Sequence, residues 1–260
     1  MTTGALSGLD TVTTDNTVDI TEDGIRFRSD VTVELVRSAA SDSDVIWSAR
    51  VSTAGEKSIE EIDKDPAASK GLINYLLKNR HGTPFEHNSM TFLISAPIFV
   101  FREFHRHRVG WSYNEESGRY RELQPVFYVP AAERNLIQQG KAGHYEFVPG
   151  TPEQSAIVTQ ATKNACRTSY EAYQEMLEAG IAREVARGVL PVATYSTMYA
   201  TCNARSLMSF LSLRTKAADS RFPSFPQREI EMVAEGMEAH FAELMPLTYS
   251  AFLAAGRVSP

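Results

Sequence analysis

The sequence lacks the features that define several classes of protein. Only 2 cysteines occur in 260 residues, so there is no disulfide framework, and no Cys-x-x-Cys motif indicates zinc or redox chemistry. No run of about 18 apolar residues predicts a membrane-spanning helix. The first residues lack the basic start and apolar run of a secretory signal. We therefore expect a cytoplasmic protein.

Basic residues are outnumbered by acidic ones, with 26 Lys and Arg against 32 Asp and Glu. The formal net charge is −6, with 43% hydrophobic and 22% charged residues, a composition typical of globular domains. An acidic total provides no general attraction to nucleic acid or to an anionic membrane, so we expect neither as a partner. Any anion site must therefore be a local concentration of cationic side chains.

The apolar spacing mixes helices and strands without the regular alternation of a parallel α/β fold. It predicts one α+β domain over residues 25–260, a largely antiparallel sheet flanked by long helices, after a loose or variable leader at 1–24. Strands are predicted at 31–37, 88–95, 119–129 and 194–202, and helices at 43–52, 71–78, 97–108, 151–180, 183–189, 203–214, 226–244 and 247–255.

Three helix starts carry capping signals. Thr83 with Glu86, and Thr151 with Gln154, match the capping box, each with proline at the first helical position. Asn203 is a suitable cap for the helix that follows it. The free N–H groups of a short helix that starts at Thr83 would form a modest anion site.

The densest concentration of cations is the segment REFHRHRVGWSYNEESGRYR, residues 102–121. Five arginines and two histidines are opposed there by three glutamates. In a helix over 97–108, Arg102 and Arg106 would share one side, and a glycine- and serine-bearing loop would follow at 109–118. Because arginine matches phosphate and carboxylate while like charges repel, this density indicates a bound anion rather than a row of surface ion pairs.

The histidines permit a second interpretation, a metal-dependent hydrolase. His105 and His107 would ligate the metal together with His81 or His87. The neighbouring arginines would repel a cation, however, and no zinc-type spacing is present. We therefore predict no metal site.

The aromatic residues permit a third interpretation, a module that binds single-stranded nucleic acid. Trp111, Tyr113 and Tyr120 would stack on bases. The acidic net charge and the lack of dispersed basic residues argue against it.

One motif is more specific than these patterns. Arg106-His107-Arg108 is followed by SYNEESGRY at residues 112–120. This combination resembles the signature of the flavin-dependent thymidylate synthases, which is RHR, seven residues and then serine. Eight residues separate Arg108 from Ser117 here, and the extra one lies before Ser112, so it lengthens the loop near Val109.

The resemblance covers residues 70–215. Further segments that carry it are HGTPFEH at 81–87, APIFV at 96–100, REVAR at 183–187, LP at 190–191, NARSLM at 203–208 and LR at 213–214. Two positions depart from the family pattern. Glu103 stands where glutamine is usual, and Ser209 stands where asparagine is expected.

The resemblance implies a role for each matching residue. The substrate dUMP would be held by Glu103, Phe104, His105, Arg106, Glu115, Glu116, Ser117, Gly118, Arg119, Arg187 and Arg214. FAD would be held by His81, Thr83, Arg106, His107, Arg108, Glu115, Asn203, Ala204, Arg205 and Ser209. Arg214 would be catalytic, because a guanidinium at the N3/O2 edge of uracil stabilises the charge that develops as C5 becomes nucleophilic.

The resemblance also implies the reaction. NADPH reduces FAD, 5,10-methylenetetrahydrofolate gives its methylene to C5 of dUMP, and the flavin hydride completes the methyl group of dTMP. The sequence has no glycine-rich dinucleotide motif, so NADPH would dock transiently against the flavin. Active sites would be shared between subunits of a homotetramer, so that Arg187 and Arg214 serve a pocket made largely by another chain.

The cysteines bear on the mechanism. Cysteine-dependent thymidylate synthases add a thiolate to C6 of dUMP, and such a thiolate needs an activating environment. Cys166 lies in a polar helical stretch and Cys202 at the end of a β-prone run, neither in a motif that resembles that nucleophile. We interpret both as structural, in agreement with a route that uses no enzyme thiol.

Overall fold

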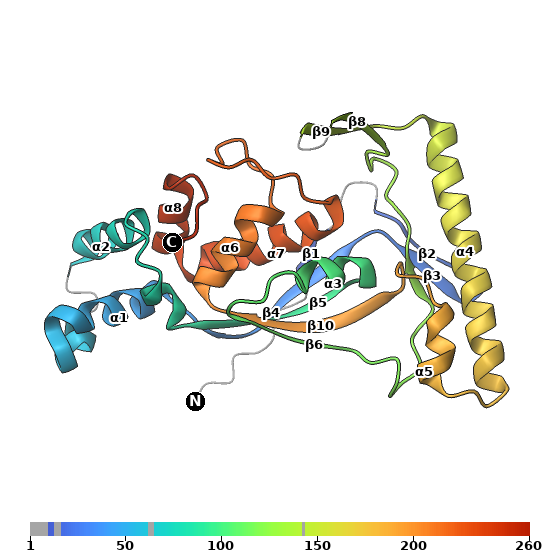
Figure 1. Ribbon diagram of the computed structural model, residues 1–260, viewed down its shortest axis with the longest axis horizontal. Coiled ribbons are helices and arrows are strands. Elements are labelled where there is room, and N and C mark those ends of the chain that lie inside the picture. The colour runs from blue at the N-terminus through green and yellow to red at the C-terminus, as the bar shows by residue number, and fades with distance from the viewer. Residues whose placement is uncertain (1–9, 13–16, 62–64, 142–143) are drawn as a thin grey trace.

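The computed structural model describes residues 10–12, 17–61, 65–141 and 144–260. Its centre is a five-stranded antiparallel sheet in the order β1, β4, β5, β10 and β6 (Figure 1). These strands are β1 (Asp10–Val12), β4 (Val31–Ala39), β5 (Ser89–Pro97), β10 (Tyr195–Cys202) and β6 (Trp111–Glu115). Continuous pairing of β5 with β10, from Pro97 opposite Tyr195 to Met90 opposite Cys202, fixes the register of the sheet.

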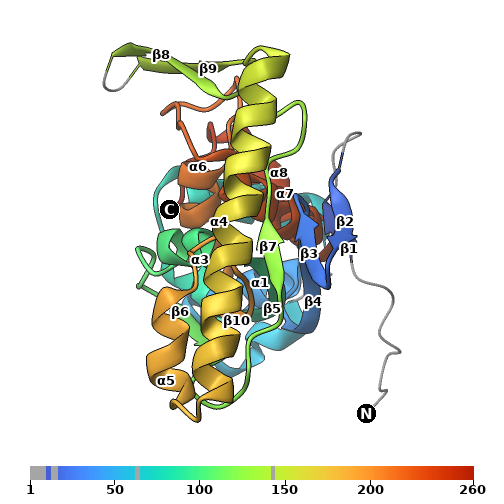
Figure 2. The same cartoon turned by 90° about the vertical axis from the view of Figure 1, so that its right-hand side faces the viewer.

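Helices cover one face of this sheet and both ends of the molecule (Figures 1 and 2). The α-helices are α1 (Asp42–Ala54), α2 (Pro66–Lys78), α3 (Ile98–Phe104), α4 (Pro152–Glu178), α5 (Arg183–Ala186), α6 (Ala204–Arg214), α7 (Arg228–Leu244) and α8 (Pro246–Ala254). The 3₁₀ helices are η1 (Gly55–Glu61), η2 (Thr83–Glu86) and η3 (Arg187–Val189). Among the described residues, no helix combines the length and apolar character needed to cross a membrane.

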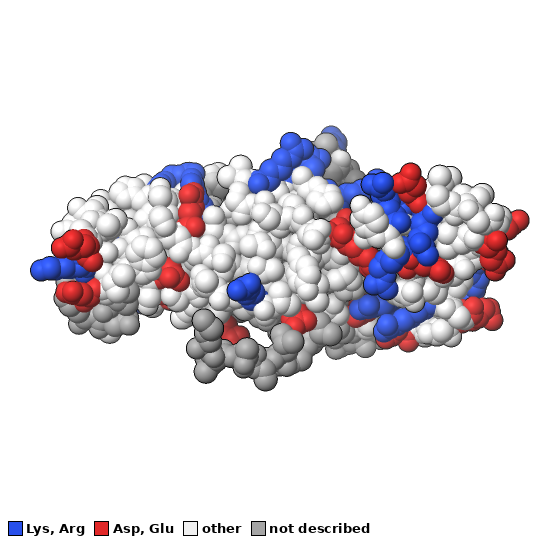
Figure 3. Space-filling model, turned by 90° about the horizontal axis from the view of Figure 1, so that it is seen from below, with Lys and Arg blue, Asp and Glu red and all other residues white. Residues whose placement is uncertain are grey.

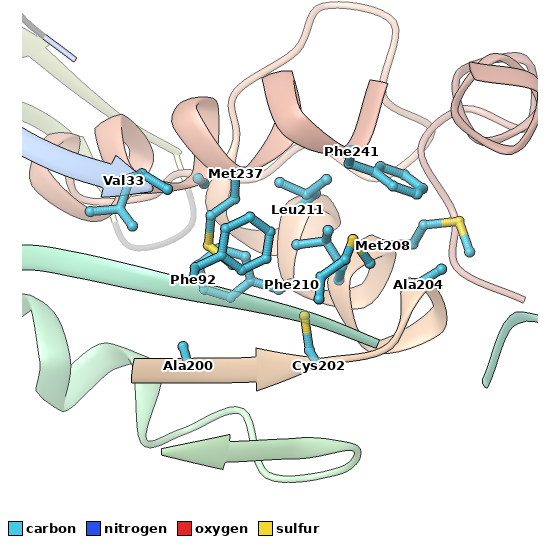
Figure 4. Close-up of a cluster of buried hydrophobic side chains, with 14 of the residues drawn as sticks. Val33, Phe92, Ala200, Cys202, Ala204, Met208, Phe210, Leu211, Met237 and Phe241 are labelled. Atoms are coloured by element: carbon cyan, nitrogen blue, oxygen red, sulfur yellow. The ribbon is translucent and has the colours of Figure 1, made fainter. Parts of the chain in front are cut away.

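The main core lies between the sheet and helices α6 and α7. Phe92 and Ile94 of β5 and Ala200 of β10 are fully buried, because alternate residues of a strand point to one face. Figure 4 shows Phe92, Ala200 and Cys202 directed toward the helical layer that carries Phe210 and Met237. The opposite face of the sheet is open in Figure 1, where no described element lies below its middle.

Smaller sheets connect this centre to α4. In the first, β3 (Ile25–Arg28) pairs antiparallel with β2 (Asp19–Glu22) and parallel with β7 (Val126–Tyr128). In the second, β8 (Ile137–Lys141) pairs with β9 (His144–Val148). Phe27, Phe127 and Cys166 of α4 belong to a second buried cluster. Figure 2 shows α4 running along this side of the molecule.

The structure confirms the predicted α+β domain with antiparallel pairing and most of the predicted helices. Two capping predictions are also confirmed. The Thr151 side chain accepts from the N–H of Gln154 at 3.3 Å, and the Gln154 side chain accepts from the N–H of Thr151 at 2.8 Å. Asn203 Oδ1 accepts from the N–H of Ser206 at 2.9 Å, so α6 begins where the sequence predicted.

The region around the RHR motif differs from the prediction. The helix expected at 97–108 ends at Phe104, so Arg102 and Arg106 do not share one side of a helix. The Tyr113 hydroxyl lies 3.0 and 2.8 Å from the carbonyl oxygens of Phe104 and His107 and donates its one proton there, while the Phe104 carbonyl also accepts from the N–H of His107 at 2.8 Å. The loop predicted at 109–118 contains strand β6, which its polar residues had concealed.

Three further predictions need correction. Thr83 does not cap a helix by its side chain, and only the four-residue η2 follows Gly82, too short for the predicted anion site. The leader at 1–24 is not wholly loose, since β1 and β2 pair with β4 and β3; its residues 1–9 and 13–16 lie outside the described part. The strand predicted at 119–129 shortens to β7, because a turn at Ser117–Tyr120 precedes it.

Candidate active site

The predicted catalytic arginine lies at the end of α6, against the end of α3. Arg214 Nη1 lies 2.5 Å from Oε2 of Glu103, and Arg214 Nε–H donates to Nε2 of His107 at 3.0 Å. The Arg214 and Glu103 side chains are only 19% and 23% exposed. Partial burial and a carboxylate on one side hold the guanidinium in one orientation.

The protonation state of His107 follows from this contact. Burial lowers the pKa of His107 to about 4, and the positive charges of Arg214 and Arg106 add to the effect. The imidazole is therefore neutral at pH 7, and its Nε2 can accept from Arg214. Burial also raises the pKa of Glu103, and the attraction of Arg214 only partly offsets this shift. Arg214 thus faces one neutral acceptor and one carboxylate.

Aromatic packing fixes the position of His107. The Phe210 ring of α6 stacks on Phe104 at 4.8 Å between ring centroids and meets the His107 ring edge-on at 4.9 Å. Phe210 and Phe104 are fully buried. The predicted contact of Phe104 with dUMP therefore cannot come from its side chain in this chain.

The lengthened loop after Arg108 docks on the start of α6. Ser206 Oγ donates to the carbonyl of Val109 at 2.9 Å. Gly110 has φ +69°, and a Cβ there would lie 2.1 Å from Ser206 Oγ, so only glycine permits this approach. The extra residue of the signature is therefore accommodated by packing the loop against α6.

A second group of predicted residues lies beside α5. Arg119 Nε donates to Oε2 of Glu184 at 2.9 Å, and both side chains are about half exposed, at 52% and 54%. Gly118 is buried, and a Cβ on it would lie 3.2 Å from Cδ of Arg187. Figure 3 shows charged side chains gathered at this end of the molecule, over the region of α4 and α5. The close approach of Gly118 thus brings the predicted phosphate-binding loop next to Arg187.

A third group joins η2 to the start of α6. Arg205 Nη1 lies 2.5 Å from Oε1 of Glu86, and its Nε donates to the carbonyl of Pro260 at 2.9 Å. A Cβ at Gly82 would lie 2.5 Å from the Arg205 guanidinium, so the missing side chain makes room for it. Ala204 is fully buried and its N–H donates to Oδ1 of Asn88 at 2.8 Å.

The remaining predicted site residues vary in exposure. The exposed ones are His81, Thr83, His105, Arg106, Arg108 and Ser209, and the half-buried ones are Glu115, Glu116, Ser117 and Asn203. In one chain the predicted residues thus form three groups, at the end of α6, beside α5 and at η2. None of them lines the pocket between Pro130 and the start of α4, or the pocket between the C-terminal ends of α2 and α8.

Sequence reasoning missed several residues that build these groups. Glu184 and Glu86 pair with arginines, and Phe210 supports His107. Tyr113 was assigned only to base stacking, although its hydroxyl binds the backbone. The helical spacing marks Phe210 as a core residue, but no sequence pattern signals the partner of an exposed arginine.

The structure gives no support to the two other interpretations. Within the described residues, no three His, Cys, Asp or Glu side chains are grouped to hold a metal. Trp111 and Tyr113 stack on each other at 5.7 Å and both contact the buried Phe104 ring edge-on, so they do not form a free stacking surface. Of the three aromatic candidates only Tyr120 is largely exposed, at 79%.

The cation donors suit a cofactor with a diphosphate group. Arg106 and Arg108 are exposed, and no carboxylate of the described residues forms an ion pair with either. Further donors are His81, two residues before η2, Asn203, which caps α6, and Arg205 in the first turn of α6. His107 is half-buried and neutral, so its imidazole suits contact with the edge of a planar ring better than a charged imidazolium would. This donor set is compatible with FAD.

Comparison with known proteins agrees with the motif. The model of the family described as thymidylate synthase complementing protein matches residues 34–247. A flavin-dependent thymidylate synthase of Streptomyces coelicolor is 69% identical over 236 residues, 91% of this chain and 96% of that protein. One from Tropheryma whipplei is 55% identical over 234 residues, 90% of this chain and 97% of that protein.

Solved structures show the same fold. The UMP/dUMP methylase PolB from Streptomyces cacaoi bound with 5-Br dUMP has a TM-score of 0.85 and 57% identity, over 90% of this chain and 99% of that one. The same protein bound with 5-Br UMP has a TM-score of 0.83 and 55% identity, over 91% of this chain and 100% of that one.

Proposed function

Because the chain belongs to the family of flavin-dependent thymidylate synthases, we propose that it converts dUMP to dTMP with FAD, 5,10-methylenetetrahydrofolate and NADPH. The observation that carries this proposal is the environment of Arg214, whose guanidinium is held by Glu103 and by a neutral His107. The relatives and the RHR motif support the same assignment.

We assign Arg214 to activation of the pyrimidine. Its guanidinium would bind the N3/O2 edge of uracil and stabilise the ionised or enolate-like ring from which C5 attacks the methylene group. The Glu103 carboxylate orients Arg214 before substrate binds, and it can accept from the ring N3–H. His107 stays neutral at pH 7, so Arg214 carries the positive charge at this end of the site.

The phosphate of dUMP is assigned to the loop beside α5. Ser117 supplies a hydroxyl, and Arg119 and Arg187 supply cations, of which Arg119 is held by Glu184. An exposed ion pair is weak, so phosphate can replace Glu184 at little cost. Arg106, Arg108, His107, Asn203 and Arg205 would hold the flavin, which when bound would supply the hydride for the methyl group.

A homotetramer with shared active sites would unite the three groups of residues. Support comes from the open face of the central sheet, where Tyr199 is 48% exposed beside Leu93. Few charged side chains lie across the middle of the corresponding face in Figure 3, which suits contact with a second copy. Native mass spectrometry of the purified protein tests this, and a monomer that is active would contradict it.

An anaerobic assay tests the proposed reaction. The purified protein should show a flavin absorption band that NADPH bleaches. Addition of dUMP and 5,10-methylenetetrahydrofolate should then yield dTMP and tetrahydrofolate. A colourless protein that binds no added FAD, or bleaching without any dTMP, would contradict the proposal.

UMP is a second candidate substrate for the same site. The solved neighbour is named a UMP/dUMP methylase, and it binds both 5-Br UMP and 5-Br dUMP. The assay should therefore compare kcat/KM for the two nucleotides. We expect dUMP to be preferred, because the relatives of highest identity reported above are named thymidylate synthases.

A further inference from the structure

A pocket of about 500 Å³ lies between the C-terminal ends of α2 and α8. Figure 1 shows these two helices packed at one end of the molecule, near the C-terminus of the chain. Its floor is apolar, with Leu77, Ala251 and Val258 among its residues, and Asn74 and Ser259 add polar groups. The size is typical of a small-molecule site.

The charge of this pocket is entirely positive. Lys78, Arg80 and Arg221 line it, and its lining contains no Asp or Glu. All three side chains are exposed, and in the described part of the chain none of them forms an ion pair with a carboxylate. The helix C-termini contribute only about half a negative charge each, so three full cations leave an excess of positive charge.

Backbone geometry fixes the positions from which two of these side chains extend. Arg80 has φ +59°, the left-handed conformation that glycine usually supplies after the end of a helix. Gly256 has φ +69°, and a Cβ on it would lie 2.9 Å from Cβ of Arg221. The N–H of Arg221 donates to the carbonyl of Gly256 at 2.9 Å. Arg80 thus stands at the left-handed position that ends α2, where its N–H donates to the carbonyl of Leu77 at 3.1 Å, and Gly256 lets the backbone of Arg221 approach the end of α8.

We propose that this pocket binds the phosphate group of a small anionic molecule, most favourably a nucleoside diphosphate. Two guanidinium groups and an ammonium donate the hydrogen bonds that the oxygens of a diphosphate accept, the apolar floor suits the face of the base, and Asn74 and Ser259 can bond the sugar hydroxyls. None of the residues that line the pocket is among the predicted dUMP or FAD residues, so the pocket is distinct from both predicted sites, and it adjoins the FAD residues where Ser259 Oγ donates to the carbonyl of Arg205 at 3.0 Å. Its existence does not depend on the proposed reaction.

Binding is tested by isothermal titration calorimetry. The full-length protein is first saturated with FAD and dUMP, and pyrophosphate or UDP is then titrated into it. We expect one site per chain for each probe and tighter binding of UDP. Equal affinities would restrict the site to the diphosphate group. Failure of both probes to bind would overturn the proposal.

Arg80→Gly separates the role of the charge from the role of the fold. Glycine suits φ +59°, so the thermal midpoint should stay the same or rise while pyrophosphate affinity falls at least 10-fold. Lys78→Ala with Arg221→Ala should also weaken binding at least 10-fold. The matched control is Lys70→Ala, an exposed lysine on α2 outside the pocket, which should change affinity less than 2-fold. Undiminished binding in Arg80→Gly, or an equal loss in the control, would contradict the assignment.

Discussion

The two ends of the proposed dUMP site differ in how firmly the protein holds them. At the pyrimidine end, Arg214 is half-buried and bonded to Glu103 and His107 over packed aromatic rings. At the phosphate end, Arg119 is half exposed and has one carboxylate partner, Glu184. The chain therefore prepares the group that acts on the reacting ring, and leaves the group that binds the phosphate to adjust to its ligand.

The largest effect on turnover should follow from loss of Arg214, at the pyrimidine end of the site. Arg214→Ala should lower kcat about 10²–10³-fold, the range for loss of a donor that stabilises developing charge. Bound flavin should remain, because Arg214 is not among the predicted FAD residues. Turnover is measured anaerobically, and flavin by its visible absorption.

Two variants control for this result. Arg102→Ala removes an exposed arginine of α3 without a predicted role and should leave kcat unchanged. Glu103→Gln replaces the carboxylate that orients Arg214 by the amide usual in the family, whose oxygen can still accept from Arg214, so kcat should stay within about 3-fold, a difference of less than 1 kcal/mol. Retained turnover in Arg214→Ala would remove Arg214 from its role.

The second prediction concerns Arg119, at the phosphate end of the site. Arg119→Ala should raise KM for dUMP about 10-fold and change kcat little, since a charged hydrogen bond contributes about 1.5–3 kcal/mol. Stability should change by less than about 0.5 kcal/mol, because the Arg119–Glu184 pair is exposed. Glu184→Ala is the matched control, and its KM should not rise. A fall in kcat with unchanged KM would show that Arg119 acts in the chemical step and not in binding of the phosphate.

The third prediction uses the protonation of His107. Its pKa in the folded chain, about 4, lies below the unfolded value of about 6.5, so neutral His107 stabilises the fold above pH 6.5. This contribution is lost as pH falls from 6.5 toward 4. After discounting for partial exposure, we expect wild type to lose about 1–2 kcal/mol more than His107→Gln over that range. Urea unfolding at several pH values measures the difference, and parallel pH profiles would refute it.

The sequence predicted these two ends unequally for physical reasons. Helix α6 was predicted correctly from its Asn203 cap to Arg214, because capping and apolar spacing are local signals. The RHR segment was predicted as helix but forms a turn, in which the N–H of His107 donates to the carbonyl of Phe104 and the Tyr113 hydroxyl contacts the carbonyls of Phe104 and His107. That contact comes from a neighbouring strand, and local spacing does not report it.

For the site residues too, the sequence predicted local features and missed the contacts between separate elements. The motif identified Glu103, His107 and Arg214 individually, yet their mutual bonds depend on how α3 meets α6. The motif also included Phe104 and Ala204, whose side chains are fully buried in this chain. Strands β2 and β8 were missed, because their short polar stretches carry no clear alternation of apolar residues.

The smallest effect is expected at the cysteines, which lie at neither end of the site. Cys166 belongs to the cluster beneath α4, and Cys202 to the core of the central sheet. Burial raises the pKa of Cys166 to about 11 and also raises that of Cys202, so neither thiol is ionised at pH 7. The double variant Cys166→Ala, Cys202→Ala should therefore keep kcat within about 2-fold, a change of roughly 0.4 kcal/mol in the barrier. The free energy of unfolding should fall by about 1 kcal/mol for each buried thiol that is removed. A folded, flavin-loaded double variant that makes no dTMP would mean that a thiol takes part in the reaction after all, and that neither end of the site described above is sufficient for turnover.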